Sequence, residues 1–186
     1  MSQQNRLSII AILAAIISIG VISQSLGSIQ AQEGETFSAI LSGNEEVPPT
    51  DSSATGSARF QTNDNGTQVF YSVNVTGLNE IMGTHIHNGT AGQNGDIVVS
   101  LSERQSSAGG DNAITLRGNI TKNDLQGPLQ GHELDELVGL MSDGNAYVNV
   151  HTDESQNGII RGQIESGLPQ AEINMSSISS NNTTLG

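Results

Sequence analysis

The sequence contains no cysteine, and this absence removes several kinds of chemistry at once. Without cysteine the fold cannot be held by disulfides, and thiolate zinc sites and cysteine nucleophiles are excluded. Tryptophan is also absent, and aromatic residues make up only 3% of the chain. The hydrophobic core must therefore come mainly from valine, isoleucine, leucine and alanine. Glycine is abundant, with 22 residues and no collagen-like period, which is typical of a turn-rich β protein.

Positive charge is scarce as well. Six lysine and arginine residues face 19 aspartate and glutamate residues, and the formal net charge is -13. Nucleic acids and anionic membrane surfaces would repel such a chain. We therefore expect no nucleic-acid partner, and contact with a membrane only through the N-terminal segment.

The N-terminal segment has the pattern of an export signal. Arg6 precedes an apolar run over residues 7–22, and Ala31 offers a small residue for cleavage. Residues 1–31 are therefore predicted to be a signal peptide, or an uncleaved anchor formed by residues 7–23. In either case the remaining chain is expected to be secreted or held at the cell surface.

Short segments of alternating hydrophobicity predict a β protein. Residues 132–141 are the one helical candidate, because their apolar side chains recur at helical spacing. The absence of a βαβ pattern and the frequent turns favour an all-β sandwich or Greek-key barrel of about eight strands over residues 36–166. The polar residues 167–186 are predicted to be a disordered tail. The predicted strands cover residues 36–42, 57–62, 68–75, 83–88, 96–101, 114–120, 146–152 and 159–164.

Three of the four histidines lie in two of these strands. His85 and His87 point to one face and Ile86 to the other, while His151 shares its face with Tyr147 and Asn149. Residues i and i+2 of a strand have Cα atoms roughly 6.5 Å apart. Two imidazoles at that spacing can therefore bind one ion at about 2.0 Å each.

A third imidazole from a neighbouring strand would complete a three-nitrogen site that suits copper or zinc. His85, His87 and His151 are the predicted ligands, facing outward and reachable by solvent. The alternative is structural: His85 and His87 hydrogen-bond to the backbone or to Asn149 and organise the loop that follows. The sequence leaves both interpretations open.

Three other polar residues are candidates for a binding or catalytic role. Arg161 is expected on the outer face in an exposed salt bridge, with Asp96 or Asp153 as its partner, or in a role that steers a substrate. Glu45 and Glu46 are expected to be solvated loop residues. No Ser-His-Asp arrangement, Gly-x-Ser-x-Gly elbow or pair of catalytic carboxylates is present. The protein is therefore not expected to be an enzyme.

Acceptor triplets for N-glycosylation are frequent, and an exported chain could carry glycans at them. Asn74 and Asn119 lie in the interior of predicted strands, which makes them poorer candidates. The acceptors are Asn65, Asn74, Asn88, Asn119, Asn174, Asn181 and Asn182.

The sequence resembles the CHRD domain, the module named after chordin. The resemblance begins at Phe37-Ser38-Ala39-Ile40-Leu41-Ser42-Gly43 and Val47-Pro48-Pro49, continues through His85-Ile86-His87-Asn88-Gly89, and ends with residues 145–152 and 158–164. It covers essentially residues 37–164 in the family's order. It implies an immunoglobulin-like β-barrel in an exported protein, and it implies little about activity. In animals this domain sits in secreted antagonists of morphogens, and a single copy behind a signal peptide looks like the microbial form.

A fainter resemblance is to copper/zinc superoxide dismutase, a Greek-key barrel that also has a His-x-His strand and a later Val-x-His strand. His85, His87 and His151 would match three of its copper ligands. A histidine that bridges copper and zinc is missing, and so is a zinc-site cluster. His132, the only histidine left, lies at the start of the predicted helix.

Together these observations predict an exported CHRD-domain protein that acts as an extracellular binding or structural module. Its partner would be an extracellular protein or a glycan. The alternative is a copper- or zinc-binding protein with a three-histidine site, extending to superoxide chemistry.

Overall fold

A computed structural model describes residues 34–107 and 112–167. The chain divides into residues 1–31 and 32–186, and the described residues belong to the second unit. The predicted signal segment, and all of the predicted tail except Gly167, lie outside the described residues. None of the helices within the described ranges is long and apolar enough to cross a membrane.

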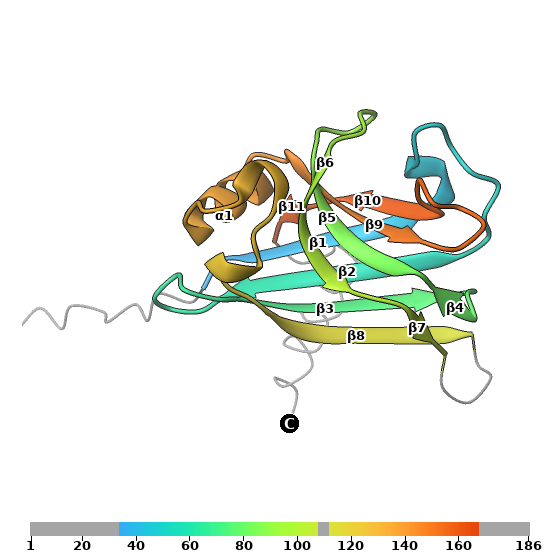
Figure 1. Cartoon of the computed structure of the whole chain (residues 1–186), viewed down its shortest axis with the longest axis horizontal. Coiled ribbons are helices and arrows are strands. Elements are labelled where there is room, and N and C mark those ends of the chain that lie inside the picture. The colour runs from blue at the N-terminus through green and yellow to red at the C-terminus, as the bar shows by residue number, and fades with distance from the viewer. Residues whose placement is uncertain (1–33, 108–111, 168–186) are drawn as a thin grey trace, which may run out of the picture. The chain divides into compact units, whose positions relative to one another are not determined.

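One antiparallel sheet dominates the structure, with the strand order β6-β5-β9-β10-β1-β2-β3-β8 (Figure 1). A ninth, two-residue strand, β11 (Glu165–Ser166), pairs with β1, and β4 (Glu80–Ile81) pairs with β7 (Gln105–Ser106) in a small second sheet. The eight strands of the main order are β1 (Thr36–Ser42), β2 (Thr55–Thr62), β3 (Val69–Thr76), β5 (Gly83–Asn88), β6 (Asp96–Ser102), β8 (Ala113–Ile120), β9 (Ala146–His151) and β10 (Ile160–Gln163).

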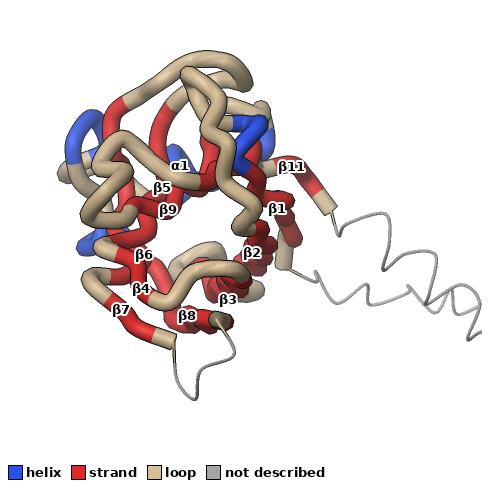
Figure 2. The backbone as a smooth tube through the Cα atoms, turned by 90° about the vertical axis from the view of Figure 1, so that its right-hand side faces the viewer, coloured by secondary structure: helices blue, strands red, loops and turns tan. Residues whose placement is uncertain are grey.

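The main sheet curls until its two ends approach each other. Figure 2 looks into the resulting barrel, with the strands arranged around a central core. The end strands β6 and β8 contact each other, and the Tyr71 hydroxyl on β3 donates to the Leu101 carbonyl on β6 at 2.6 Å. Of the two predicted forms, sandwich or barrel, the structure has the nearly closed barrel.

The predicted strands form because their apolar residues alternate. On β1, Phe37, Ala39 and Leu41 are buried while Ile40 is exposed, and β3 shows the same period. All eight predicted strands are present, with ends within two residues of the predicted ones. The prediction of an all-β fold with about eight strands and one short helix is therefore confirmed.

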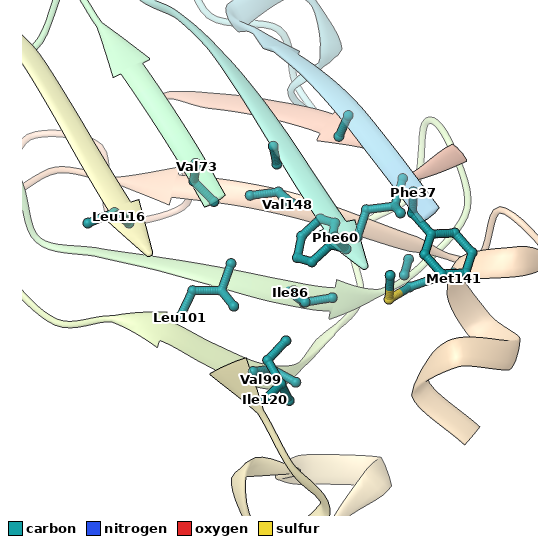
Figure 3. Packing of buried hydrophobic residues seen from close by; sticks show 14 of the residues in the cluster. Phe37, Phe60, Val73, Ile86, Val99, Leu101, Leu116, Ile120, Met141 and Val148 are labelled. Atoms are coloured by element: carbon teal, nitrogen blue, oxygen red, sulfur yellow. The ribbon is translucent and has the colours of Figure 1, made fainter. Parts of the chain in front are cut away.

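The core is built mainly from aliphatic side chains, as the composition requires. Phe37 and Phe60 lie opposite each other on β1 and β2, and the interior around them is filled by aliphatic residues and Met141. Figure 3 shows this packing, including Val73, Ile86, Val99, Leu101, Leu116, Ile120 and Val148.

The one α-helix of the described residues, α1 (Leu134–Ser142), lies where the helical spacing predicted it. Its buried residues are Leu134, Leu137 and Met141, and it contacts β9 and β11. Three short 3-10 helices were not predicted: η1 (Gly43–Glu45), η2 (Lys122–Asp124) and η3 (Gly127–Leu129). The polar segment 102–112 contains β7, and residues 108–111 lie outside the described part of the chain.

The middle strands are covered on both faces. All six residues of β9 are buried, although its sequence alternates between apolar and polar side chains. Loops 43–54, 89–95 and 152–158 lie over the outer face, where Asn94 Nδ2 donates to the Val47 carbonyl and Thr50 Oγ1 donates to the Ile159 carbonyl. The outward-pointing polar residues of β5, β9 and β10 therefore lie beneath loops, and this arrangement creates the site.

Candidate metal centre

The two histidine strands are neighbours in the sheet. β5 pairs with β9 so that Gly83 lies opposite His151, His85 opposite Asn149 and His87 opposite Tyr147. The side chains of His85, His87 and His151 point to the same face, and each offers a ring nitrogen within 4.8 Å of the other two. The ring centroids of His85 and His151 are 4.8 Å apart, and that of His87 lies 6.0 Å and 5.8 Å from them. The structure thus brings together the three predicted ligands.

A glycine makes room for the first histidine. A Cβ atom on Gly83 would lie 3.2 Å from Cε1 and 3.3 Å from Nε2 of His85. The imidazole of His85 therefore leans across the backbone at Gly83, toward His151 on the next strand. Any larger residue at position 83 would have to displace this ring.

The centre is more enclosed than the sequence predicted. His87 and His151 are 7% and 5% exposed, and only His85 is half-buried. The expectation of solvent-facing ligands is therefore wrong for two of the three residues, because the loops cover the face to which these side chains point. His85 is the one member of the cluster whose side chain is partly exposed.

Backbone carbonyls determine which nitrogens of two rings are free. Nδ1 of His87 lies 2.9 Å from the Gly95 carbonyl oxygen, and Nδ1 of His151 lies 2.9 Å from that of Gln156. A carbonyl oxygen can only accept, so Nδ1 is the protonated nitrogen in both rings and Nε2 carries the lone pair. This is the arrangement that fixes tautomer and ring orientation in metal-binding histidines.

The remaining nitrogens have no hydrogen-bond partner. Nε2 of His87, Nε2 of His151 and Nδ1 of His85 are buried without a partner among the described residues. Leaving a buried polar atom unpaired costs about 1–3 kcal/mol, so three such atoms in one cluster require an explanation. A bound cation that accepts three lone pairs supplies one.

The same surroundings favour neutral imidazoles. Burial, together with the smaller effect of the charges of His151 and His87, lowers the pKa of His85 to about 4. Burial also lowers the pKa of His87 and of His151, and hydrogen bonds to the Gly95 and Gln156 carbonyls oppose it only in part. Neutral imidazole is the form that binds metal.

The alternative role, in which the histidines organise a loop, involves only the Nδ1 atoms of His87 and His151. His87 and His151 do hold loops through their backbone hydrogen bonds, as that interpretation requires. The Asn149 amide is not their partner, because its Nδ2 donates to the Asn157 carbonyl at 3.2 Å. A loop-organising role therefore accounts for two ring nitrogens and leaves the three unpaired ones unexplained.

Arg161 lies on the predicted face but not in the predicted setting. It is 1% exposed and donates to backbone and side-chain oxygens of loop 89–95, with its guanidinium over the Tyr147 ring. The expected exposed salt bridge is wrong, because Asp153 pairs instead with Arg104 at 2.7 Å. Burial also rules out steering a substrate from solvent. The periodicity placed the side chain correctly, but it contained no information about the covering loop.

Glu46 also lies in a different setting from the predicted one. Glu45 is exposed, as expected, but Glu46 is 4% exposed and therefore not solvated. Burial raises the pKa of Glu46 to about 7, opposed by the charge of Arg161 and by a hydrogen bond from the Val47 backbone. Its Oε1 and Asn149 Oδ1 both lie within 2.5 Å of the point where a Gly158 Cβ would sit.

The fourth histidine is not part of the centre. His132 is exposed just before α1 and is absent from the cluster of ring nitrogens. Among the described residues there is therefore no histidine that could bridge to a second metal, as the dismutase resemblance would require.

Comparison with known proteins adds one finding. The CHRD domain family matches residues 37–164, which include all three clustered histidines, Tyr147 and Arg161. A search of curated proteins found no match to the chain.

Proposed function

The chain belongs to the CHRD domain family, and we propose that it is an exported protein that binds one copper or zinc ion through His85, His87 and His151. One observation carries this proposal. The three histidines come from two adjacent strands, each offers a ring nitrogen within 4.8 Å of those of the other two, and each has one buried ring nitrogen without a hydrogen-bond partner.

The chemistry of the donors selects the class of ion. Three imidazole nitrogens suit zinc and copper, whereas calcium and magnesium prefer oxygen ligands. The cluster contains no carboxylate. The half-buried His85 leaves the ion accessible from one side, so a small molecule or water could occupy a further coordination position. This favours reversible binding over a closed structural site.

The general binding-module function does not require these features. An extracellular protein or glycan partner would be recognised by surface residues, and such recognition gives no reason for three unpaired nitrogens beneath the loops. Superoxide turnover has less support than metal binding, because the exposed His132 cannot supply a bridging ligand. We therefore propose metal binding rather than turnover.

Metal content measured by mass spectrometry tests the proposal. The purified protein is loaded with copper or zinc, dialysed and compared with His87→Ala, His151→Ala and His132→Ala. We expect about one ion per chain in the wild type and in His132→Ala, because the fourth histidine lies outside the centre. In His87→Ala and His151→Ala we expect an affinity loss beyond the roughly 10–100-fold that is typical when a group hydrogen-bonded to a metal ligand is removed. A well-folded wild type that retains no metal would overturn the proposal.

Export has a separate test. Residues 1–31 have the charge and hydropathy pattern of an export signal. Cleavage predicts a protein in the medium that begins at Gln32, and an anchor predicts an intact N-terminus in the membrane fraction. N-terminal sequencing distinguishes the two, and a chain found only in the cytoplasm would contradict export.

A further inference from the structure

A stack of three side chains leads from the metal-binding nitrogens to loop 89–95. The ring of Tyr147 lies nearly parallel to that of His87, with centroids 4.9 Å apart and an interplanar angle of 10°. The guanidinium carbon of Arg161 lies 3.8 Å from the centroid of the Tyr147 ring. β9 lies between β5 and β10, so the tyrosine connects the histidine of one strand to the arginine of the other.

Arg161 also holds the loop above it. Its guanidinium donates to the Gln93 carbonyl at 3.1 Å, to Asn94 Oδ1 at 3.2 Å and to the Thr90 carbonyl at 3.4 Å. Three acceptors from one loop thus converge on a single planar group, whose fork of donors is pre-organised for such contacts.

The far end of this loop returns to the histidine. The Gly95 backbone nitrogen donates to the Tyr147 hydroxyl at 3.1 Å, and the Gly95 carbonyl accepts from His87 Nδ1. Gly95 therefore touches both rings of the stack. Loop, tyrosine and arginine together determine where the acceptor for His87 lies and how the imidazole is turned.

Burying Arg161 in this way would be energetically unfavourable if packing were its only role. Among the described residues Arg161 forms no salt bridge with a carboxylate, although it is almost completely buried. Burying an arginine is costly, and apolar side chains of similar volume often stabilise such positions better. The polar contacts of Arg161 therefore indicate a role in fixing the loop.

We propose that Arg161 and Tyr147 are positioning residues of the metal centre, which hold Gly95 and the ring of His87 so that Nε2 is directed at the ion. This inference rests on the proposed function. It assigns the two residues no contact with the metal itself. It explains why a buried arginine and tyrosine lie beside the one histidine whose acceptor comes from loop 89–95.

Zinc affinity and the tautomer of His87 provide the test. Zinc affinity is measured by competition with a chelator for the wild type, Arg161→Lys, Arg161→Met, Tyr147→Phe and the control Arg117→Lys. Arg117 is exposed on β8, so its replacement changes the same residue type away from the centre. Long-range proton–nitrogen NMR on the zinc-free protein reports which nitrogen of His87 carries the proton, a property that a purely structural role would not change.

We expect a roughly 10–100-fold loss of zinc affinity in both Arg161 variants, as is typical when a group that orients a metal ligand is removed. Tyr147→Phe keeps the stack and loses only the acceptor for Gly95, so its loss should be smaller. The wild type should show His87 protonated at Nδ1, and the Arg161 variants a mixture of tautomers. Arg117→Lys should match the wild type in both measurements.

Two failures can be told apart. If the wild type binds zinc and the folded variants bind it equally well with an unchanged His87 tautomer, the positioning role is wrong and the metal site stands. If the wild type binds no zinc or copper, the proposed function fails and this inference fails with it. Should the Arg161 variants not fold, Tyr147→Phe alone decides: unchanged affinity and tautomer would overturn the inference.

Discussion

Each histidine of the centre uses its two ring nitrogens differently. In His87 and His151 one nitrogen donates to a backbone carbonyl and the other lies unpaired in the interior. His85 has its buried Nδ1 free and its Nε2 against Gly83. In His87 and His151 the direction of the lone pair is therefore determined by a backbone carbonyl.

Gly83→Ala tests the contact beneath His85. The added Cβ would lie 3.2–3.3 Å from the His85 ring and 3.3 Å from the Ser102 carbonyl, so the imidazole must shift by a few tenths of an ångström. We expect zinc affinity to fall by about tenfold, as for other changes that turn a ligand. Chelator competition measures this. Unchanged affinity in a folded variant would show that His85 is free to move.

Glu46→Gln tests the buried carboxyl beside Asn149. Burial raises the pKa of Glu46 from its usual value of 4.5 to about 7 in the fold. A raised pKa means that its contribution to stability is fully present below pH 4.5 and is lost as the pH rises through 7. Glu46→Gln should therefore match the wild type near pH 4.5 and exceed its free energy of unfolding at pH 8 by about 1–3 kcal/mol.

Urea denaturation at the two pH values measures this difference. Glu45→Gln is the matched control, because Glu45 is the exposed neighbour and should show no such divergence. If Glu46→Gln were destabilised equally at both pH values, the carboxyl would not be a source of pH dependence.

At the scale of elements, β9 organises the centre. Ala146, Val148 and Val150 belong to the hydrophobic core cluster, and the alternate positions carry Tyr147, Asn149 and His151 toward the covering loops. One strand thus supplies a proposed metal ligand, the stacking ring and the Asn149 amide. Because successive side chains of a strand point to opposite faces, the same six residues serve the core and the site.

The helix α1 permits a prediction of its own. Gly139 lies within α1, and a Cβ added there meets no atom within 4 Å. Glycine is about 0.8–1.0 kcal/mol less favourable than alanine in a helix interior, so Gly139→Ala should raise the free energy of unfolding by about 0.5–1 kcal/mol.

Gly144→Ala is the control for this helix, because it also has open space but a φ of +67°. Such a backbone conformation is strained for alanine, so this variant should be less stable than the wild type. Chemical denaturation of both variants checks the signs. If both variants changed the free energy of unfolding in the same direction, the different backbone roles given to Gly139 and Gly144 would be contradicted.

At the scale of the whole barrel, closure depends on few contacts. The two end strands, β6 and β8, are not neighbours in the hydrogen-bonded strand order. The Tyr71 hydroxyl reaches from β3 to the Leu101 carbonyl on β6 at 2.6 Å. A single side chain thus joins two parts of the sheet that lie far apart along the strand order.

Tyr71→Phe removes this contact and keeps the ring. We expect a loss of about 1 kcal/mol in the free energy of unfolding, the usual net value of one hydrogen bond, with zinc affinity unchanged. Tyr147→Phe should do the reverse, weakening zinc binding more than stability. Thermal unfolding and chelator competition on both variants measure this. If Tyr71→Phe alone weakened zinc binding, closure and metal binding would be coupled.

The sequence by itself determined the elements and the faces. Alternation of apolar residues predicted all eight main strands, and helical spacing predicted α1, because both patterns follow from local backbone geometry. The same periodicity placed His85 and His87 on one side of their strand and Arg161 on the outer face. The three two-residue strands, β4, β7 and β11, escaped prediction, since two residues are too few to establish a period.

Only the tertiary structure decided what happens on the outer face. Strand order made β5 and β9 neighbours, which turned a pair of histidines and a distant third into one cluster. Loops packed over that face buried Arg161 and Glu46, which the sequence had assigned to solvent. Loop coverage depends on contacts between residues far apart in the chain, such as Arg161 with Thr90. Local periodicity cannot predict such contacts, because it reflects only the backbone geometry of neighbouring residues.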